Sequence, residues 1–245
     1  MDHNEEFEQY WKSLISDVPA NLNSPEAQYL LQTIPRFPDE AVYIYSFKER
    51  KMIYASGWQD ILGYKDDEIN MLAIINMSAP KFAPFSAEVN RKAMKFILSK
   101  KDQLDKYSFS IELKKIHKNG SEVPIVARVG VHGVENGKVV SIIGNFRVDH
   151  NLYFGKIMRY ASYGPEREEF ELELDQMLFY EMVISNKEKE ALAMAANGYA
   201  FKQIADELKV SVSAIEKRII PLYKRFNVNS LAHLVGFAYE NHILP

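Results

Sequence analysis

The sequence predicts an α+β protein in which a five-stranded antiparallel sheet with helices is followed by an all-α domain. Two observations support this prediction. Runs of β-branched and aromatic residues occur in the order two strands, several helices and three strands between residues 41 and 148. From residue 183 onward, apolar residues instead recur at helical spacing. With 245 residues, the chain has room for two domains of moderate size.

Two helices are expected before the sheet. The first covers residues 4–17, where large apolar residues fall on one face: Phe7, Trp11, Leu14 and Ile15. The second begins after Ser24, which can cap it, and Pro25 suits its first position. It should end near Thr33, because prolines follow.

The five strand-like runs cover residues 41–47, 52–56, 106–117, 121–134 and 138–148. Asn119-Gly120 and Asn136-Gly137 separate the last three, and Asn-Gly pairs favour hairpins because both residues tolerate positive φ. Helical patterns at 58–63, 66–75 and 87–100 lie between the second and third strands. Residues 151–182 are expected to form a helical linker that is interrupted at Gly164-Pro165. The predicted segments are therefore 1–36, 37–150, 151–182 and 183–245.

Composition excludes several classes of site. The chain has no cysteine, which excludes disulfides, thiolate zinc sites, cysteine nucleophiles and cysteinyl flavin adducts. No apolar run reaches the length of about 18 residues that indicates a transmembrane helix. The acidic N-terminus lacks the apolar region of a secretory signal, so no membrane association and a cytoplasmic location are expected. No G-x-S-x-G, HExxH or P-loop pattern occurs, so neither an enzyme nor a catalytic or metal site is predicted.

The last segment contains the most specific pattern. Ser185 stands three residues before Glu188, as in a capping box, and the helix that starts there stops at Gly198. A second helix covers 201–208 and a turn follows it. Ser211 can cap a third helix with one apolar stripe: Ile215, Ile219, Leu222 and Phe226. A last helix is expected at 230–241.

The third helix also has a polar and mostly basic side. A small unit of helices with a tight turn and cations on the outer face of its later helix is typical of DNA-binding helix-turn-helix domains. The candidate DNA-contacting residues are Lys202, Ser211, Ser213, Glu216, Lys217, Arg218, Lys224 and Arg225. The alternative is a helical protein–protein domain with a solvated basic face.

This region resembles the LuxR-type helix-turn-helix. The matching positions are Ser185, Glu188, Glu190, Gly198, Lys202, Ile204, Ala205, Leu208, Ser211, Ile215, Arg225 and Val228. The resemblance implies double-stranded DNA as a partner. Asn227 stands where the family usually has glycine, and it can also adopt left-handed φ. Pro221 departs from the pattern, and we expect a bend or an early helix end there.

Residues 37–149 resemble a PAS domain. The matching elements are Ile61 to Ile69 (ILGYKDDEI), the turn Lys118-Asn119-Gly120-Ser121 and the last strand, which ends at Asp149. The resemblance implies helices over one face of a five-stranded antiparallel sheet, often with a cavity for a signal. Candidate pocket residues are Tyr54, Trp58, Phe96, Phe109 and Phe146, although such aromatics more often form the core.

The identity of a cofactor is left open by the sequence. His117 and His132 could be haem ligands, but exposed or hydrogen-bonded strand histidines are the simpler expectation. The sequence is also compatible with free flavin, with a small apolar molecule, or with no ligand and a domain that acts only as a dimerisation surface.

The sequence thus predicts a homodimeric DNA-binding transcription regulator. Its PAS-like domain would sense a small molecule or a partner and control dimerisation or DNA binding. The alternative function is a protein-interaction adaptor that assembles through the same domains without binding DNA.

Overall fold

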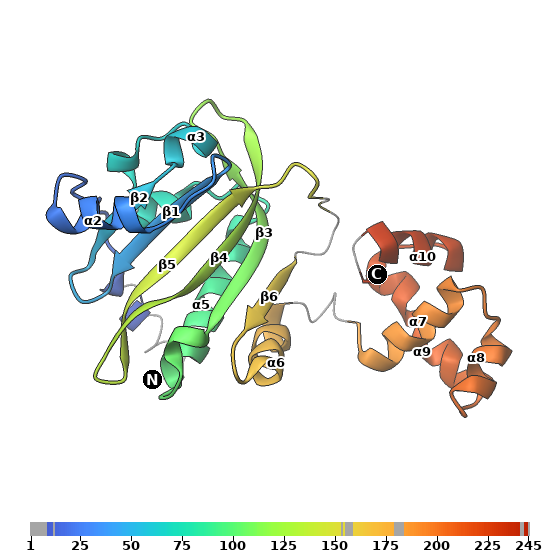
Figure 1. Cartoon of the computed structure of the whole chain (residues 1–245). Coiled ribbons are helices and arrows are strands. Elements are labelled where there is room, and N and C mark those ends of the chain that lie inside the picture. The colour runs from blue at the N-terminus through green and yellow to red at the C-terminus, as the bar shows by residue number, and fades with distance from the viewer. Residues whose placement is uncertain are drawn as a thin grey trace. The chain divides into compact units, whose positions relative to one another are not determined.

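The computed structural model describes residues 9–11, 13–152, 154, 159–178, 184–240 and 243–244. The chain divides into two compact units (Figure 1). The front unit contains helices α2 to α6 and six strands, and the C-terminal unit contains α7 to α10. Part of the helix expected at 4–17, including Phe7, lies outside the described residues. Within them the backbone is helical at 9–11 and 13–14 and is no longer helical from Ile15 onward.

The front unit is built on one antiparallel sheet with the strand order β2-β1-β5-β4-β3-β6. The strands are β1 (Glu40–Ser46), β2 (Lys51–Ser56), β3 (Ser108–Ile116), β4 (Glu122–Glu135), β5 (Lys138–Val148) and β6 (Tyr160–Tyr163). The first five correspond to the five predicted runs. Asn136 and Gly137 have φ of 51° and 70°, so the β4–β5 hairpin uses the left-handed turn that this pair favours.

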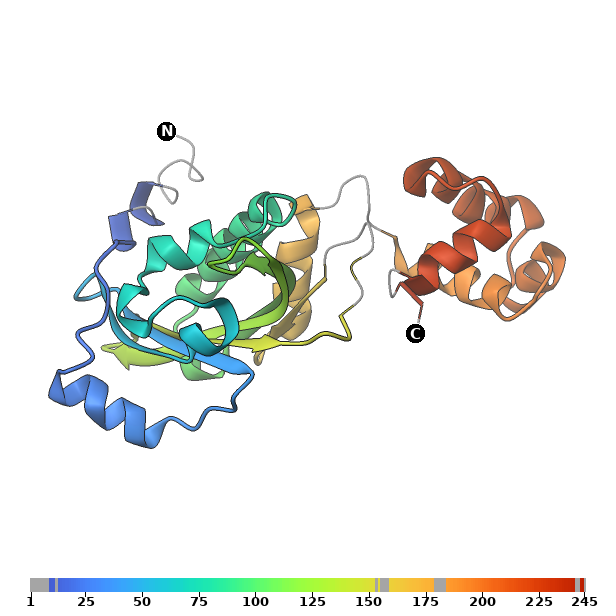
Figure 2. The same cartoon turned by 90° about the horizontal axis from the view of Figure 1, so that it is seen from above.

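The helices of the front unit lie mainly on one side of the sheet, and Figure 2 shows α5 along that face and α2 on the other side. Their bounds are α2 (Pro25–Thr33), α3 (Trp58–Leu62), α4 (Met71–Asn76) and α5 (Ala83–Ser99). The predicted cap of α2 is confirmed, since the Ser24 hydroxyl accepts the Ala27 N–H at 3.1 Å. Proline at the first position and a cap thus define where α2 starts.

The segment 151–182 contains a strand that the sequence did not predict. Strand β6 pairs with the first half of β3, which adds a sixth strand to the sheet. Its sequence, YASY, is too short to show an alternating pattern, and it joins the sheet through backbone hydrogen bonds. Helix α6 (Arg167–Leu178) follows and packs on α5, where the rings of Phe170 and Phe96 stack with centroids 4.4 Å apart. Residues 160–178 therefore belong to the front unit.

The C-terminal unit consists of α7 (Asn186–Ala196), α8 (Phe201–Glu207), α9 (Val212–Phe226) and α10 (Leu231–Glu240). The predicted apolar stripe of α9 is buried at all four positions, in a core shared with the other three helices. The capping box of α7 is present, because the Ser185 N–H donates to Glu188 Oε2 at 2.7 Å and the Glu188 N–H to Ser185 Oγ at 3.3 Å. Asn227 has φ of 53°, as expected for its position after α9.

Helix α9 does not end at Pro221, so the expectation of an early helix end is wrong. The helix runs from Val212 to Phe226 without interruption. Leu222 and Phe226, which follow the proline, are buried in the core, and this packing holds the last turns in place. Pro221 itself is exposed, so its ring meets solvent. Because proline has no N–H, the Lys217 carbonyl lacks its usual helical donor.

Candidate functional site

The turn between α8 and α9 is held by backbone hydrogen bonds. Lys209 adopts left-handed φ of 53°. Its N–H donates to Asp206 O at 3.3 Å and the Val210 N–H donates to Ala205 O at 2.9 Å, which together form a Schellman motif. Ser211 then caps α9, since its hydroxyl accepts the Ala214 N–H at 3.2 Å. These contacts fix α9 against α8 as a helix-turn-helix.

The side of α9 opposite its buried stripe is exposed and mostly polar. Ser213, Glu216, Lys217 and Lys224 are all exposed, and Lys202 on α8 is exposed as well. Ser211 is exposed too, although its hydroxyl is used in the cap. The structure therefore places six of the eight candidate DNA-contacting residues at the solvent surface of the α8–α9 pair.

The two arginines of the candidate set differ from the lysines. Arg218 is half-buried, and within the described part of the chain its buried Nη1 has no hydrogen-bond partner. A buried guanidinium nitrogen without an acceptor is unfavourable, so a ligand that supplies an acceptor would stabilise it.

Arg225 instead joins α9 to α7. Its Nη2 lies 3.1 Å from Glu188 Oε1 and its Nη1 donates to Glu188 Oε2 at 3.2 Å. Burial opposes ionisation of Glu188, but hydrogen bonds from the Ser185 N–H and from Arg225 outweigh it and hold the pKa of Glu188 below its usual value. The sequence indicated the cap made by Glu188 but gave no sign of its partner, which is 37 positions away.

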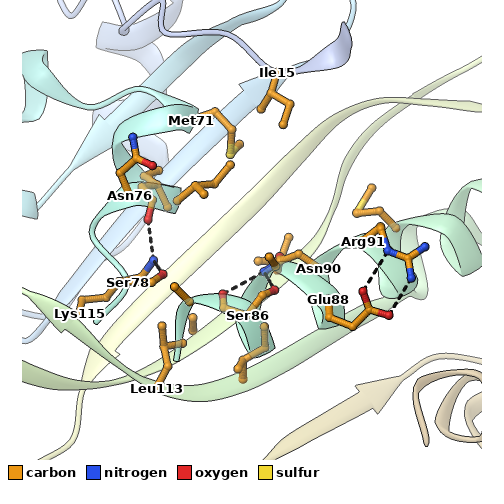
Figure 3. A pocket seen from close by; sticks show the side chains of 18 of the residues that line it. Ile15, Met71, Asn76, Ser78, Ser86, Glu88, Asn90, Arg91, Leu113 and Lys115 are labelled. Atoms are coloured by element: carbon orange, nitrogen blue, oxygen red, sulfur yellow. Dashed lines mark hydrogen bonds and ion pairs between the residues drawn. The ribbon is translucent and has the colours of Figure 1, made fainter. Parts of the chain in front are cut away.

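The front unit contains a cavity of about 640 Å³ between the sheet and helices α4 and α5 (Figure 3). This size is within the range of ligand-binding sites. Most of its lining is apolar, including Met71, Ile74, Met94, Leu113 and Ile142. The front unit thus has space for a small molecule.

Polar groups are few in this cavity. Figure 3 shows Lys115 and Ser78 at one end in this view and the Glu88–Arg91 ion pair at the other. Lys115 is 3% exposed, and its Nζ donates to Ile74 O at 2.6 Å and to Ser78 Oγ at 2.9 Å. Burial lowers the pKa of Lys115 to about 7, so the amine is partly neutral at physiological pH.

Of the five predicted pocket aromatics, Phe146 lines this cavity, and among the described residues the other four do not. Trp58 and Phe109 are fully buried, and Tyr54 packs with Val42 and Ile44. Phe96 is on the side of α5 that faces α6, where it stacks on Phe170. These four residues are core, which was the simpler expectation for aromatics in a sheet and its helices.

Lys115 is not among the site residues predicted from the sequence, although the sequence contains a signal for it. In β3 burial alternates strictly, and Phe109, Ile111, Leu113 and Lys115 occupy the buried positions. A lysine in this series must face the same side of the sheet as the core residues. The alternation could therefore have identified it as an unusual buried cation.

The two histidines considered as haem ligands lie elsewhere. His132 Nδ1 is 3.0 Å from Ser141 Oγ, and burial lowers the pKa of His132. His117 Nδ1 accepts the Asn119 N–H at 3.0 Å in the β3–β4 turn. Within the described part of the chain, no three His, Asp or Glu side chains come together as metal ligands. A search of the same residues finds no helix with the length and apolar character needed to cross a membrane.

Residues 182–238 match the family described as bacterial regulatory proteins, luxR family. The C-terminal unit is a LuxR-type helix-turn-helix domain. This family is described as regulatory proteins. The LuxR-type domain is also similar to the oxygen regulatory protein NreC of Staphylococcus carnosus (strain TM300), with 34% identity over 62 residues. That match covers 25% of this chain and 29% of NreC, so the chain spans under a third of the relative's length.

Two solved structures show low similarity to the chain. The phage VqmA–DPO complex has 15% identity and a TM-score of 0.37, over 88% of this chain and 87% of that chain. The PAS domain of a protein from Colwellia psychrerythraea has 14% identity and a TM-score of 0.36, over 46% of this chain and 88% of that one. The front unit has a PAS-like fold, with an antiparallel sheet and helices over the face that bounds the cavity.

Proposed function

We propose that this protein is a transcription regulator whose LuxR-type domain binds double-stranded DNA and whose PAS-like unit binds a small molecule that controls this activity. The observation that best supports DNA binding is the exposed, basic side of α9, together with Arg218, whose Nη1 has no partner among the described residues. Phosphate and base-edge oxygens are the acceptors that such cations bind. The domain division 1–36, 37–150, 151–182 and 183–245 remains part of the proposal, with residues 160–178 of the linker packed in the front unit.

The set of DNA-contacting residues can be ordered by their surroundings. We propose Lys202, Lys217 and Lys224 as phosphate contacts, because each is exposed. Ser211, Ser213 and Glu216 lie at the start of α9, which in helix-turn-helix domains approaches the bases. Arg225 is assigned a supporting role through Glu188, and Arg218 remains a candidate for direct contact.

A homodimer is part of the same proposal. One helix-turn-helix covers only a short half-site, and two copies related by two-fold symmetry read two half-sites at a fixed spacing. Light scattering of the full chain at tens of micromolar checks this directly. A monomer, combined with DNA binding that depends linearly on protein concentration, would contradict it.

Helix α5 offers a route by which occupation of the cavity could affect the segment leading to the LuxR-type domain. One side of α5 lines the cavity with Ser86, Asn90 and Met94. Its other side holds α6, through the stacked rings of Phe96 and Phe170 and through Lys100, which bonds to Glu166 and Glu169. A ligand that shifts α5 would therefore also shift α6.

An electrophoretic mobility-shift assay with fragments of the source genome tests the proposed function. We expect the full chain to shift a subset of fragments, and Lys217→Ala combined with Arg218→Ala to abolish the shift. If the full chain shifts no fragment but still forms specific complexes with another protein, the adaptor function is supported instead.

A further inference from the structure

The cavity of the PAS-like unit contains a buried cation with unused donor capacity. A protonated lysine has three N–H donors, and Lys115 uses two of them on Ile74 O and Ser78 Oγ. Within the described part of the chain no carboxylate pairs with it. Glu88, the acidic residue that lines the cavity, is held by Arg91 at 2.7 Å.

A second buried donor lies on the same wall. Tyr43 is 3% exposed and lines the cavity, and within the described residues its hydroxyl makes no hydrogen bond. Its ring lies over Gly144, where an added Cβ would be 2.0 Å from the ring. The Tyr43 and Phe146 ring centroids are 5.9 Å apart, and Lys115 Nζ is 5.5 Å from the Phe146 centroid. Tyr43 and Lys115 therefore both lie near the Phe146 ring.

Of the amide groups that line the cavity, Asn76 is exposed and Asn90 is used within α5. Asn90 Nδ2 donates to Ser86 O at 2.7 Å, so both residues are engaged within α5. The cavity thus presents donors, one of them a cation without a counter-charge, to a space with mostly apolar walls. A ligand with an anionic acceptor and an apolar body satisfies both features. A cationic ligand would be repelled by the protonated amine, and a neutral one would supply no counter-charge to it.

We propose that this cavity binds a small organic carboxylate, whose acid group accepts a hydrogen bond from Lys115 and whose apolar body lies against Phe146, Met94 and Ile142. The proposal rests on the proposed small-molecule function of the PAS-like unit and specifies its ligand class. Tyr43 is a second donor to the ligand on the same wall.

The ionisable groups around the cavity predict proton uptake on binding. They are Tyr43 on β1, Glu88 and Arg91 on α5, and Lys115 itself. Burial raises the pKa of Tyr43, which therefore remains neutral. Lys115, with a pKa near 7, is mostly neutral at pH 8 and must gain a proton to pair with a carboxylate. Carboxylate binding at pH 8 should thus take up about one proton per chain.

Isothermal titration calorimetry of the full chain tests the proposal, with octanoate and 3-phenylpropanoate as probes and their primary amides as neutral controls. Titration in phosphate and in Tris, which differ in ionisation enthalpy, gives the number of protons taken up. We expect at least one acid to bind at least about tenfold more tightly than its amide, because one charge-assisted hydrogen bond changes the affinity by about that factor or more.

Lys115→Met should weaken acid binding by at least about tenfold and abolish proton uptake. Lys114→Met is the matched control, because Lys114 is the neighbour on β3 and is ion-paired to Glu122 at 2.9 Å. It should leave both quantities unchanged. Arg91→Met tests whether the other cation that lines the cavity binds the acid instead. Loss of acid binding in Arg91→Met but not in Lys115→Met would overturn the proposal.

Equal binding of acids and amides, binding without proton uptake, or no acid binding at millimolar concentration would each also overturn it. Should Lys115→Met fail to fold, the acid-to-amide ratio and the proton count of the unmodified chain still decide the question. A mobility-shift assay of the unmodified chain without any probe separates failure of the proposed ligand class from failure of the proposed function. DNA binding without acid binding refutes the ligand class alone, whereas absence of DNA binding refutes the proposed function.

Discussion

Replacing Lys115 with methionine should change how the stability of the front unit depends on pH. Methionine is similar in length to lysine and carries no charge. In the folded chain burial lowers the pKa of Lys115 from 10.5 to about 7. Between these two values the unfolded chain holds a proton that the folded chain has lost, so the free energy of unfolding rises with pH across this window.

The size of the effect follows from the shift. At about 1.4 kcal/mol per pKa unit, the protonated lysine costs the folded chain about 5 kcal/mol well below pH 7. Integrating between the two pKa values, about 2 kcal/mol of this cost disappears between pH 7 and pH 9. Lys115→Met also removes donors from Ile74 O and Ser78 Oγ, which costs about 1–3 kcal/mol per acceptor. Because this second loss is independent of pH, the change of the stability difference with pH reports on the charge of Lys115 alone.

Urea unfolding followed by tryptophan fluorescence measures this slope for the front unit. The chain has two tryptophans, Trp11 and Trp58, and both belong to the front unit. We expect the stability of Lys115→Met relative to the unmodified chain to fall by about 2 kcal/mol from pH 7 to pH 9. Lys114→Met should follow the unmodified chain. If the free energy of unfolding depends on pH in the same way in the unmodified chain and in Lys115→Met, Lys115 does not have the lowered pKa of a buried lysine.

Three other substitutions test how the helices are held. Glu188→Gln should destabilise the C-terminal unit by about 1.5–3 kcal/mol, seen as faster amide exchange in α7. Because the folded chain lowers the pKa of Glu188, this difference should vanish as the pH falls through that pKa. Unchanged exchange at neutral pH would contradict the ion pair with Arg225. Phe170→Ala should cost about 3–5 kcal/mol and speed exchange along α6 while β1 stays protected, whereas full protection of α6 would show that the stacked rings do not hold it. Pro221→Ala should supply a donor to the Lys217 carbonyl and stabilise α9 by up to about 3 kcal/mol, seen as slower amide exchange in α9. Exchange that is no slower than in the unmodified chain would contradict this.

Much of the architecture could be predicted because local patterns and tertiary packing agree. The alternation in β3 and β4 and the Asn-Gly turns specify the hairpins without long-range information. The apolar stripe of α9 matches the core that it forms with its neighbouring helices. At these positions the residue spacing and the burial carry the same information.

Other features depend on contacts between residues that are distant in the sequence. Strand β6 exists because the edge of β3 offers unpaired backbone groups, which its four residues do not reveal. The pairing of Glu188 with Arg225 joins helices that are far apart in the chain. Pro221 suggested an early helix end because local propensity was considered without the burial of Leu222 and Phe226. Four of the five predicted pocket aromatics do not line the cavity, because the sequence pattern shows that a residue is buried but not whether it faces a cavity.

The salt dependence of DNA binding tests the central claim, that the exposed cations of the α8–α9 pair bind DNA. Fluorescence anisotropy of the full chain with a labelled duplex, at a series of salt concentrations, gives the slope of log K against log salt. Replacing Lys202 and Lys217 together by alanine should reduce this slope by about 1.8, because each lysine that no longer neutralises a phosphate lowers it by about 0.9. Lys138→Ala, an exposed lysine of the front unit, should leave the slope unchanged. The same slope and affinity in the double variant as in the unmodified chain would contradict the claim.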